Sequence, residues 1–446
     1  MPLRLRGLLP SLFSTFLLGA CADDSHVGPR DTGHHGDDAG ARDGGEDPAE
    51  LPDAAVPDAH VPADAGAQSD AASNDDAGPS EDDASAPQPT YWYDAKSAVG
   101  LSISGPLSDA FGAAFAGTPD GIIPPVRNKD PFAGGMAYIN ADKSARAPQV
   151  ELAVRGNSSL QECVFPKLKV SFDKRVDATS DLFYDTKKVK IGTHCGEEDS
   201  VNGTIGRLRN EKAAWREEVA YQLARALGIT VMQTRPAVIT YTDTSQTSSF
   251  ESPLTRKAFL LEHVDELARR LGATALKDPI DCGDNPDARP DATAVLRVKF
   301  FHALIGNWDW MLGPPETHGC GTLMNTEVLV HGDGSLTLVP ADFDLAALVV
   351  GEVRNPDTNQ VEPIEVENSA AAARAALETS LIGEDPGAVE QMKASFLAKQ
   401  PELSAIVEAS LMDASGKADA LELLQGFFQA LAKRPQNRAC PCNKYQ

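Results

Sequence analysis

The sequence predicts an α+β fold in which a strand-rich part with one long helix is followed by a mostly helical part. Between residues 90 and 210, short segments alternate apolar and polar residues, which is the pattern of half-buried strands. From 367 to 434 the pattern is almost wholly helical. Because strands and helices are segregated along the chain, we expect two lobes within a folded region spanning 90–446.

The strand pattern is clearest in two neighbouring segments joined by a turn. They read "QVELAVRGNSS" and "PKLKVSFDK", and "RGNSS" is the turn between them. Further strands are predicted in "KKVKIGTH", "PAVITYTD" and "RKAFLLEHV". The run "EVLVHGDGSLTLVPADFD" predicts a hairpin, because "GDG" stands between two apolar stretches.

Helical spacing is clearest in "NEKAAWREEVAYQLARALGI". Ala214, Val219, Leu223 and Leu227 lie near the 3.6-residue period, and Gly228 gives a C-terminal stop signal. "VDELARRLG" predicts a short helix, and "TAVLRVKFFHALIGN" predicts a longer one.

The first twenty residues are typical of an export signal. Arg4 and Arg6 precede the apolar run "LLPSLFSTFLL", which is too short for a stable membrane span. The run ends in "LGAC", a lipobox-like sequence, so we expect a signal peptide over 1–20 and a lipid on Cys21; the alternative is a cleaved signal without a lipid. Ala22 favours sorting beyond an inner membrane. We therefore expect a lipid-anchored protein of the bacterial cell envelope, at the outer membrane or cell surface.

Residues 21–89 form an Asp-, Ala- and Pro-rich linker without hydrophobic periodicity, which predicts disorder. The stretch from 22 to 89 holds 18 acidic residues and two arginines, a net charge of −16 out of the chain's −25. Such a segment is self-repelling and extended, as expected of a spacer between a membrane and a folded domain. The acidity argues against nucleic acid as a partner.

The cysteine count predicts disulfides in the exported part of the chain. Besides Cys21 there are six cysteines: Cys163, Cys195, Cys282, Cys320, Cys440 and Cys442. We expect the pair Cys282–Cys320 first and Cys163–Cys195 second. A zinc site at "THC" is the competing interpretation, but no CxxC or HExxH motif supports it.

Four oxygen-bearing side chains stand at the ends of predicted elements. Asp309 follows a helix, Asn325 begins the hairpin, and Asp342 and Asp344 follow its second strand. A hairpin brings the start of one strand beside the end of the next, so these groups can converge. Two carboxylates and a carboxamide suit Mg²⁺, and a further Asp able to accept a hydroxyl proton suits phosphoryl transfer. The alternative is that "DFD" caps a helix and Asp309 pairs with a basic residue.

The order of several segments resembles the CotH kinase family, which are spore-coat and secreted proteins with an atypical protein-kinase fold. The run "VRGNSSLQECVFPKLKVSFDK" resembles the family's RGNSS…FPKK strand–turn–strand. "REEVAYQLARALGI", "KAFLLEHVDEL", "NWDW", "MNTEVLV" and "LVPADFDLA" then follow in the family's order. The resemblance spans 148–350 and implies a two-lobed atypical protein-kinase-like domain with a helical C-terminal region.

The resemblance also implies roles in catalysis and metal binding. Asp309 would be the catalytic base that orients the acceptor hydroxyl. Asn325 and Asp342 would hold Mg²⁺ or Mn²⁺, with Asp344 as an alternative or second ligand. Lys167 or Lys169 would contact the phosphates of ATP; both lie on one face of a strand, and Lys167 is preferred.

Further residues are implied around the nucleotide. The turn residues Arg155, Gly156 and Asn157 would cover the phosphates through backbone N–H groups. Glu217 or Glu218 would pair with the lysine, and of the two we take Glu218 as the expected site residue. Glu262 lies where the family's hinge-like strand passes the adenine. The structural alternative is that the lysines are solvated strand residues and the glutamates an exposed helix face.

Two functions follow from these observations. The first is a surface-tethered protein kinase that transfers a phosphoryl group from Mg-ATP to Ser or Thr of an exported protein. The second is a catalytically inactive kinase-like lipoprotein that serves as a binding or assembly module. The second is favoured by "ADFD" in place of the family's "PWDxD" and by the scarcity of ATP outside cells. No Gly-x-Ser-x-Gly, Walker or HExxH motif is present, so hydrolase, P-loop and zinc-protease functions lack their residues.

Overall fold

A computed structural model describes the folded part of the chain. The described residues are 90–116, 130–156, 163, 165–193, 212–276, 290–310, 312 and 324–433. All of them lie in one compact unit, Glu81–Gln446. The predicted signal peptide, the linker, Asn157 and every cysteine except Cys163 lie outside them. Cys163 is disulfide-bonded, and since its partner is not among the described residues, the pairing with Cys195 stays a prediction.

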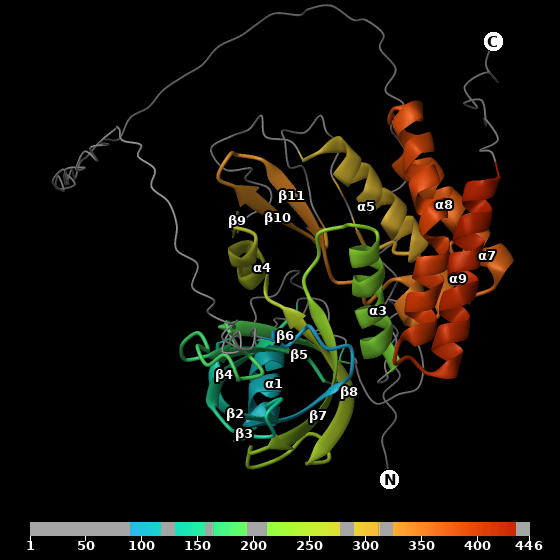
Figure 1. Ribbon diagram of the computed structural model, residues 1–446. Helices are drawn as coiled ribbons and strands as arrows, with labels where there is room; N and C mark the ends of the chain where they lie inside the picture. The colour runs from blue at the N-terminus through green and yellow to red at the C-terminus, as the bar shows by residue number, and fades with distance from the viewer. Residues whose placement is uncertain are drawn as a thin grey trace, which may run out of the picture. The chain divides into compact units, whose positions relative to one another are not determined.

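The strand-rich part is a sheet that closes on itself. Its strands are β1 (Val99–Gly105), β2 (Phe132–Ile139), β3 (Ala145–Arg146), β4 (Gln149–Arg155), β5 (Lys167–Phe172), β6 (Lys188–Gly192), β7 (Thr234–Asp243) and β8 (Leu254–Glu262). Their order is β1-β7-β8-β6-β5-β4-β2-β3, and β1 also pairs with β2, so the sheet is barrel-like (Figure 1). The β1–β7 pair is parallel and the other pairs of this sheet are antiparallel.

Apolar side chains on the inner face of the sheet form the first core. Ile103, Leu152, Val170 and Ile239 are all fully buried there. The helix α1 (Leu107–Ala116) adds the buried side chains of Leu107 and Phe111 to the same core. Alternation along each strand then directs the intervening residues outward, and on β5 these outward positions are the ones that reach the functional site.

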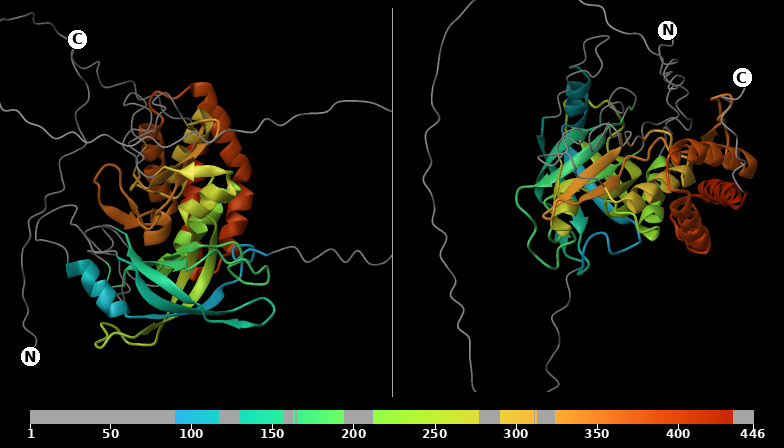
Figure 2. Two further views of the ribbon diagram at one scale, coloured as in Figure 1. Left: turned by 90° about the vertical axis from the view of Figure 1, so that its left-hand side faces the viewer. Right: turned by 90° about the horizontal axis from the view of Figure 1, so that it is seen from above.

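A second core joins the helices to the outer side of the sheet. The elements are α3 (Lys212–Ala226), α4 (Val264–Arg270), β9 (Ala273–Ala275), α5 (Ala292–Leu304), β10 (Thr326–His331), β11 (Leu336–Pro340), α6 (Ala347–Val350), β12 (Glu352–Arg354), β13 (Val361–Pro363), α7 (Val366–Ser380), α8 (Pro386–Ala409) and α9 (Ala414–Ala432). Helix α3 contacts β7 and β8 on one side and α6 and α8 on the other. It therefore links the two parts, as Figures 1 and 2 show.

Local signals explain where the helices begin and end. Helix α3 stops at Gly228, whose φ of +71° is the left-handed conformation that glycine adopts without strain. Asp291, Asp385 and Asp413 cap α5, α8 and α9 by accepting hydrogen bonds from backbone N–H groups of the first turn.

The α+β class is confirmed, and the predicted strands and helices within the described residues are present. The sequence did not indicate β1, α1 and β2 as separate elements, nor the closure of the sheet. The strand-rich part is thus barrel-like and does not by itself define the two lobes of a kinase. No helix among the described residues has the length and apolar character needed to cross a membrane.

Candidate functional site

The hairpin β10–β11 brings Asn325 and Asp342 together. Thr326 pairs with Pro340, and the backbone N–H of Ala341 donates to the carbonyl of Asn325 at 2.9 Å. Asn325 and Asp342 therefore leave the two strands side by side. Both have a positive φ, 53° and 56°, a region that residues other than glycine rarely adopt. Strained backbone of this kind is concentrated at functional sites.

Lys167 lies at the centre of a buried ion cluster. Its Nζ is 2.9 Å from Oδ1 of Asp342, 3.0 Å from Oδ2 of Asp344 and 4.0 Å from Oε2 of Glu217. The Lys167 side chain is 6% exposed, those of Asp344 and Glu217 are 7% and 4%, but that of Asp342 is 48% exposed. One carboxylate of the cluster thus reaches solvent while the lysine does not.

The charges in the cluster shift each other's pKa. Burial alone lowers the pKa of Lys167, but Asp342, Asp344 and Glu217 together raise it above its usual range. For Glu217, burial raises the pKa; Lys167 opposes this and the two aspartates reinforce it, and the result is about 7. Lys167 is therefore a permanent cation, whereas Glu217 exchanges a proton near neutral pH.

The lysine's helical partner is Glu217, which corrects the choice of Glu218. Consecutive residues of an α-helix point about 100° apart, so only one of the two can face β5. Glu218 is turned toward β7, where its Oε1 accepts from Thr234 Oγ1 at 2.8 Å. Its Oε2 accepts from Gln222 Nε2 at 2.6 Å. Glu218 therefore anchors α3 to the sheet.

Of the two candidate lysines, Lys167 is the one in the cluster. Lys169 lies two residues further along the same face of β5 and is only partly buried. Tyr221, one turn after Glu217 on α3, also supports the cluster, since its hydroxyl accepts from the backbone N–H of Asp342 at 3.2 Å. Its ring packs against Phe343 with a centroid separation of 4.6 Å. Asp342 is thereby held at its backbone by Tyr221 and at its carboxylate by Lys167.

Asp309 is placed by two asparagines. Nδ2 of Asn325 donates to Oδ2 of Asp309 at 2.9 Å and to its carbonyl at 2.6 Å. The backbone N–H of Asp309 donates to Oδ1 of Asn307 at 3.0 Å. The family resemblance named Asp309 and Asn325 as site residues but not Asn307, which lies two residues before Asp309 in "GNWDW".

A buried histidine completes this support. Because Oδ1 of Asn307 accepts from Asp309, its Nδ2 faces Nδ1 of His302 at 3.1 Å and donates to it. Burial lowers the pKa of His302 to about 3, so the ring is neutral and carries its proton on Nε2. The imidazole stacks on Trp310 at 4.1 Å. His302 thus supports Asn307, which in turn holds the backbone of Asp309.

A pocket of ≈ 340 Å³ opens beside these groups. Its lining includes Arg155, Gly156, Lys190, Glu217, Asn325 and Asp342. Gly156 follows β4 with a φ of +108°, a conformation that needs glycine. The predicted phosphate-turn residues Arg155 and Gly156 therefore share a pocket with the predicted metal ligands, while Asn157 lies outside the described residues.

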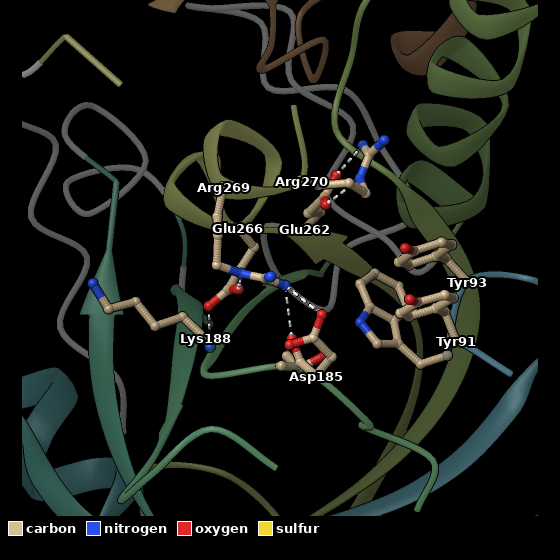
Figure 3. Close-up of a pocket in the computed structure, with 10 residues that line it drawn as sticks. Tyr91, Tyr93, Asp185, Lys188, Glu262, Glu266, Arg269 and Arg270 are labelled. Carbon is tan, nitrogen blue, oxygen red and sulfur yellow. Dashed lines mark hydrogen bonds and ion pairs between the residues drawn. The ribbon is translucent and has the colours of Figure 1, made fainter. Parts of the chain in front are cut away.

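Glu262 lies in a different pocket, shown in Figure 3. This pocket of ≈ 280 Å³ is lined by stacked Tyr91 and Tyr93 and by paired arginines and acids. Glu262 accepts from Arg270 Nε and Nη2 at 3.0 and 2.9 Å and from the backbone N–H of Gln233 at 3.0 Å. Its neighbour Leu261 lines the first pocket. Alternation along β8 thus directs the Glu262 carboxylate away from the site.

The side-chain atoms of Asn325 and Asp342 that could ligate a metal are oxygens, which fits a hard cation such as Mg²⁺. Hydrogen bonding to Asp309 fixes the Asn325 amide with Nδ2 toward the aspartate, so Oδ1 is left as its ligand atom. Asp342 keeps a half-exposed carboxylate at the pocket. The described residues hold no group of three or more His, Cys, Asp or Glu arranged for a metal.

No family model and no curated protein matches this chain. Among solved structures it is similar to the crystal structure of CtkA, a proinflammatory kinase of Helicobacter pylori, with 10% sequence identity and a TM-score of 0.30. The similarity covers 60% of this chain and 94% of that chain. This is a weak likeness to a kinase-like fold, and the function is therefore argued below from the side chains of the site.

Proposed function

We propose that the chain is a phosphotransferase that moves a phosphoryl group from Mg-ATP to a Ser or Thr hydroxyl of an exported protein. The observation that carries this proposal is that two groups of side chains contribute to one pocket, whose wall includes Glu217 and Asp342 of the first group and Asn325 of the second. One is the lysine–carboxylate cluster of Lys167, Glu217 and Asp342, and the other is the Asp309–Asn325 pair. In this proposal the barrel-like sheet and α3 correspond to one kinase lobe and the later helices to the other.

In phosphoryl transfer the lysine–carboxylate cluster and the Asp309–Asn325 pair would have different roles. A bound Mg²⁺ would neutralise phosphate charge, and Asn325 and Asp342 are the residues that would hold it, with Asp344 behind them. Asp342 and Asp344 use two of the three N–H donors of the buried Lys167 ammonium, so this lysine would orient the two carboxylates and act on the phosphates through its charge. Asp309 would accept the proton of the acceptor hydroxyl while Asn307 and Asn325 keep it oriented.

The lipid anchor on Cys21, the cell-envelope location and an exported acceptor protein belong to the same proposal. They follow from the "LGAC" signal and the acidic linker alone. An inactive binding module is the second candidate, because Lys167 already neutralises Asp342 and Asp344 without a metal. Such a pocket can be stable without ever binding a nucleotide.

Calorimetric titration of the full chain with ATP, with and without Mg²⁺, separates the two candidates. The kinase proposal predicts binding that requires Mg²⁺ and is lost in Asp342→Ala. Asp333→Ala is the matched control, since Asp333 lies in the turn of the same hairpin, where it accepts from Ser335. Asp309→Ala should retain binding and lose phosphoryl transfer. Wild-type protein that is folded but binds no nucleotide would leave the binding module as the function.

A further inference from the structure

In the sheet beside the pocket, basic residues on neighbouring strands stand directly opposite each other. In the β4–β5 pair Arg155 stands directly opposite Lys167, and in the β5–β6 pair Lys169 stands directly opposite Lys190. Residues directly opposite each other share a face of the sheet, as do residues two apart on one strand. Arg155, Lys167, Lys169 and Lys190 therefore lie on one face; we call these four residues the cationic face.

Like charges placed directly opposite each other destabilise a sheet. Lys167 is compensated by its three carboxylates. Within the described residues, however, no carboxylate lies within ion-pair distance of Arg155, Lys169 or Lys190. The Nε of Arg155 is in addition buried without a hydrogen-bond partner, while its Nη2 donates to the carbonyl of Ile191 at 3.0 Å.

Two of these uncompensated cations line the pocket itself. Arg155 and Lys190 contribute to its wall together with Asp342 and Asn325. Burial, and after it the charge of Arg155, lower the pKa of Lys190 to about 8. The carboxylates of Glu327 and Asp342 act in the opposite direction on that pKa but form no ion pair with the amine. The lysine therefore stays in an unfavourable environment that a nearby anion would improve.

We propose that Lys190 and Arg155 form an anion subsite that binds the polyphosphate chain of a nucleoside di- or triphosphate. This inference rests on the proposed function in that it names further ligand-binding residues of the same pocket. The sequence carries the signal in "KKVKIG", where alternation places Val189 and Ile191 in the core and Lys190 on the opposite face. An ammonium and a guanidinium suit phosphate oxygens through charge-assisted hydrogen bonds.

The test uses inorganic tripolyphosphate as the probe, titrated calorimetrically into the full chain without divalent metal. Wild-type protein should bind it, and Lys190→Met should weaken binding about tenfold or more, because a hydrogen bond to a charged group is lost. Lys190→Arg should keep most of the affinity. Lys174→Met is the matched control, since this lysine is 80% exposed on the chain just after β5 and should bind like wild type.

The stability of the variants gives a second readout. Removing one member of the Lys169–Lys190 pair relieves a like-charge contact, so Lys190→Met should melt at or above the wild-type temperature while binding less tightly. If Lys190 only stabilised the fold, Lys190→Met would melt below the wild-type temperature and bind tripolyphosphate as tightly as wild type. Unchanged tripolyphosphate affinity in folded Lys190→Met would overturn the inference, and so would a wild-type chain that binds no tripolyphosphate.

The same titrations separate this inference from the kinase proposal. If tripolyphosphate binds and depends on Lys190 while Mg-ATP neither binds nor donates phosphate, the kinase proposal fails and the anion subsite stands. If Mg-ATP binds with the same affinity in wild type and in Lys190→Met, the subsite is wrong even though nucleotide binding is real.

Discussion

Replacing Lys167 by Met tests the ion cluster most sharply. Methionine keeps much of the aliphatic volume of lysine and removes only the charge, so packing changes little. The substitution leaves Asp344 and Glu217 as buried carboxylates without their cation. Breaking a buried ion pair from one side typically costs about 3–5 kcal/mol.

The structure places this variant at the lower end of that range. The half-exposed side chain of Asp342 is screened by solvent and adds little. Glu217, with a pKa of about 7, can take up a proton instead of staying charged. The cost therefore falls mainly on Asp344, and we expect about 3 kcal/mol, a decrease in Tm of roughly 4 °C for a folded region of about 350 residues.

Thermal unfolding followed by circular dichroism measures this decrease at pH 7. The double variant Lys167→Met/Asp344→Asn should recover much of the lost stability, because the second change removes the unpaired charge. Lys169→Met is the control on the same face of β5 and should remain within about 0.5 kcal/mol of wild type. A Lys167→Met protein that melts with the wild type, or that Asp344→Asn does not rescue, would show that the cluster does not hold the site together.

Three further predictions concern the rest of the site. The raised pKa of Glu217 means that the folded protein binds this proton more tightly than the unfolded chain, so wild type should lose stability relative to Glu217→Gln as the pH rises from about 5 to 8. Melting curves of both proteins at the two pH values check this, and a difference in Tm between them that does not change with pH would contradict it. Asn307→Ala should lower the rate of phosphoryl transfer about tenfold or more with little change in Mg-ATP affinity, since Asn307 holds Asp309 and does not line the pocket. Equal loss of rate and affinity would assign Asn307 a purely structural role. Gly156→Ala should weaken Mg-ATP binding and destabilise the fold by about 1 kcal/mol, because alanine is strained at a φ of +108°. Calorimetry tests this, with Gly332→Ala as the control because a Cβ at Gly332 meets only open space.

Much of the site could be predicted because its residues stand at the ends of regular elements. A hairpin with "GDG" at its turn fixes the register of β10 and β11, and that register sets Asn325 beside Asp342. The alternation of β5 similarly puts Lys167 and Lys169 on one face. Periods of two and 3.6 residues are local properties, so a single sequence carries them.

The parts that were not predicted depend on contacts between distant segments. The choice between Glu217 and Glu218 is set by the rotation of α3 against β5, which no local pattern encodes. The closure of the sheet needs β1 to pair with both β2 and β7, and β7 lies more than a hundred residues after β1. The direction of the Glu262 carboxylate was likewise not predicted, since only its pairing with Arg270 shows that it points away from the site.

The central claim is that Asn325 and Asp342 hold a metal–nucleotide complex beside Asp309. A crystal structure of the full chain with Mn²⁺ and a non-hydrolysable ATP analogue tests it most directly. The account predicts anomalous density for Mn²⁺ in contact with Oδ1 of Asn325 and the carboxylate of Asp342, with the phosphates toward Lys167 and Lys190. Crystals grown with both ligands that contain neither in this pocket, or that bind the nucleotide elsewhere, would contradict it.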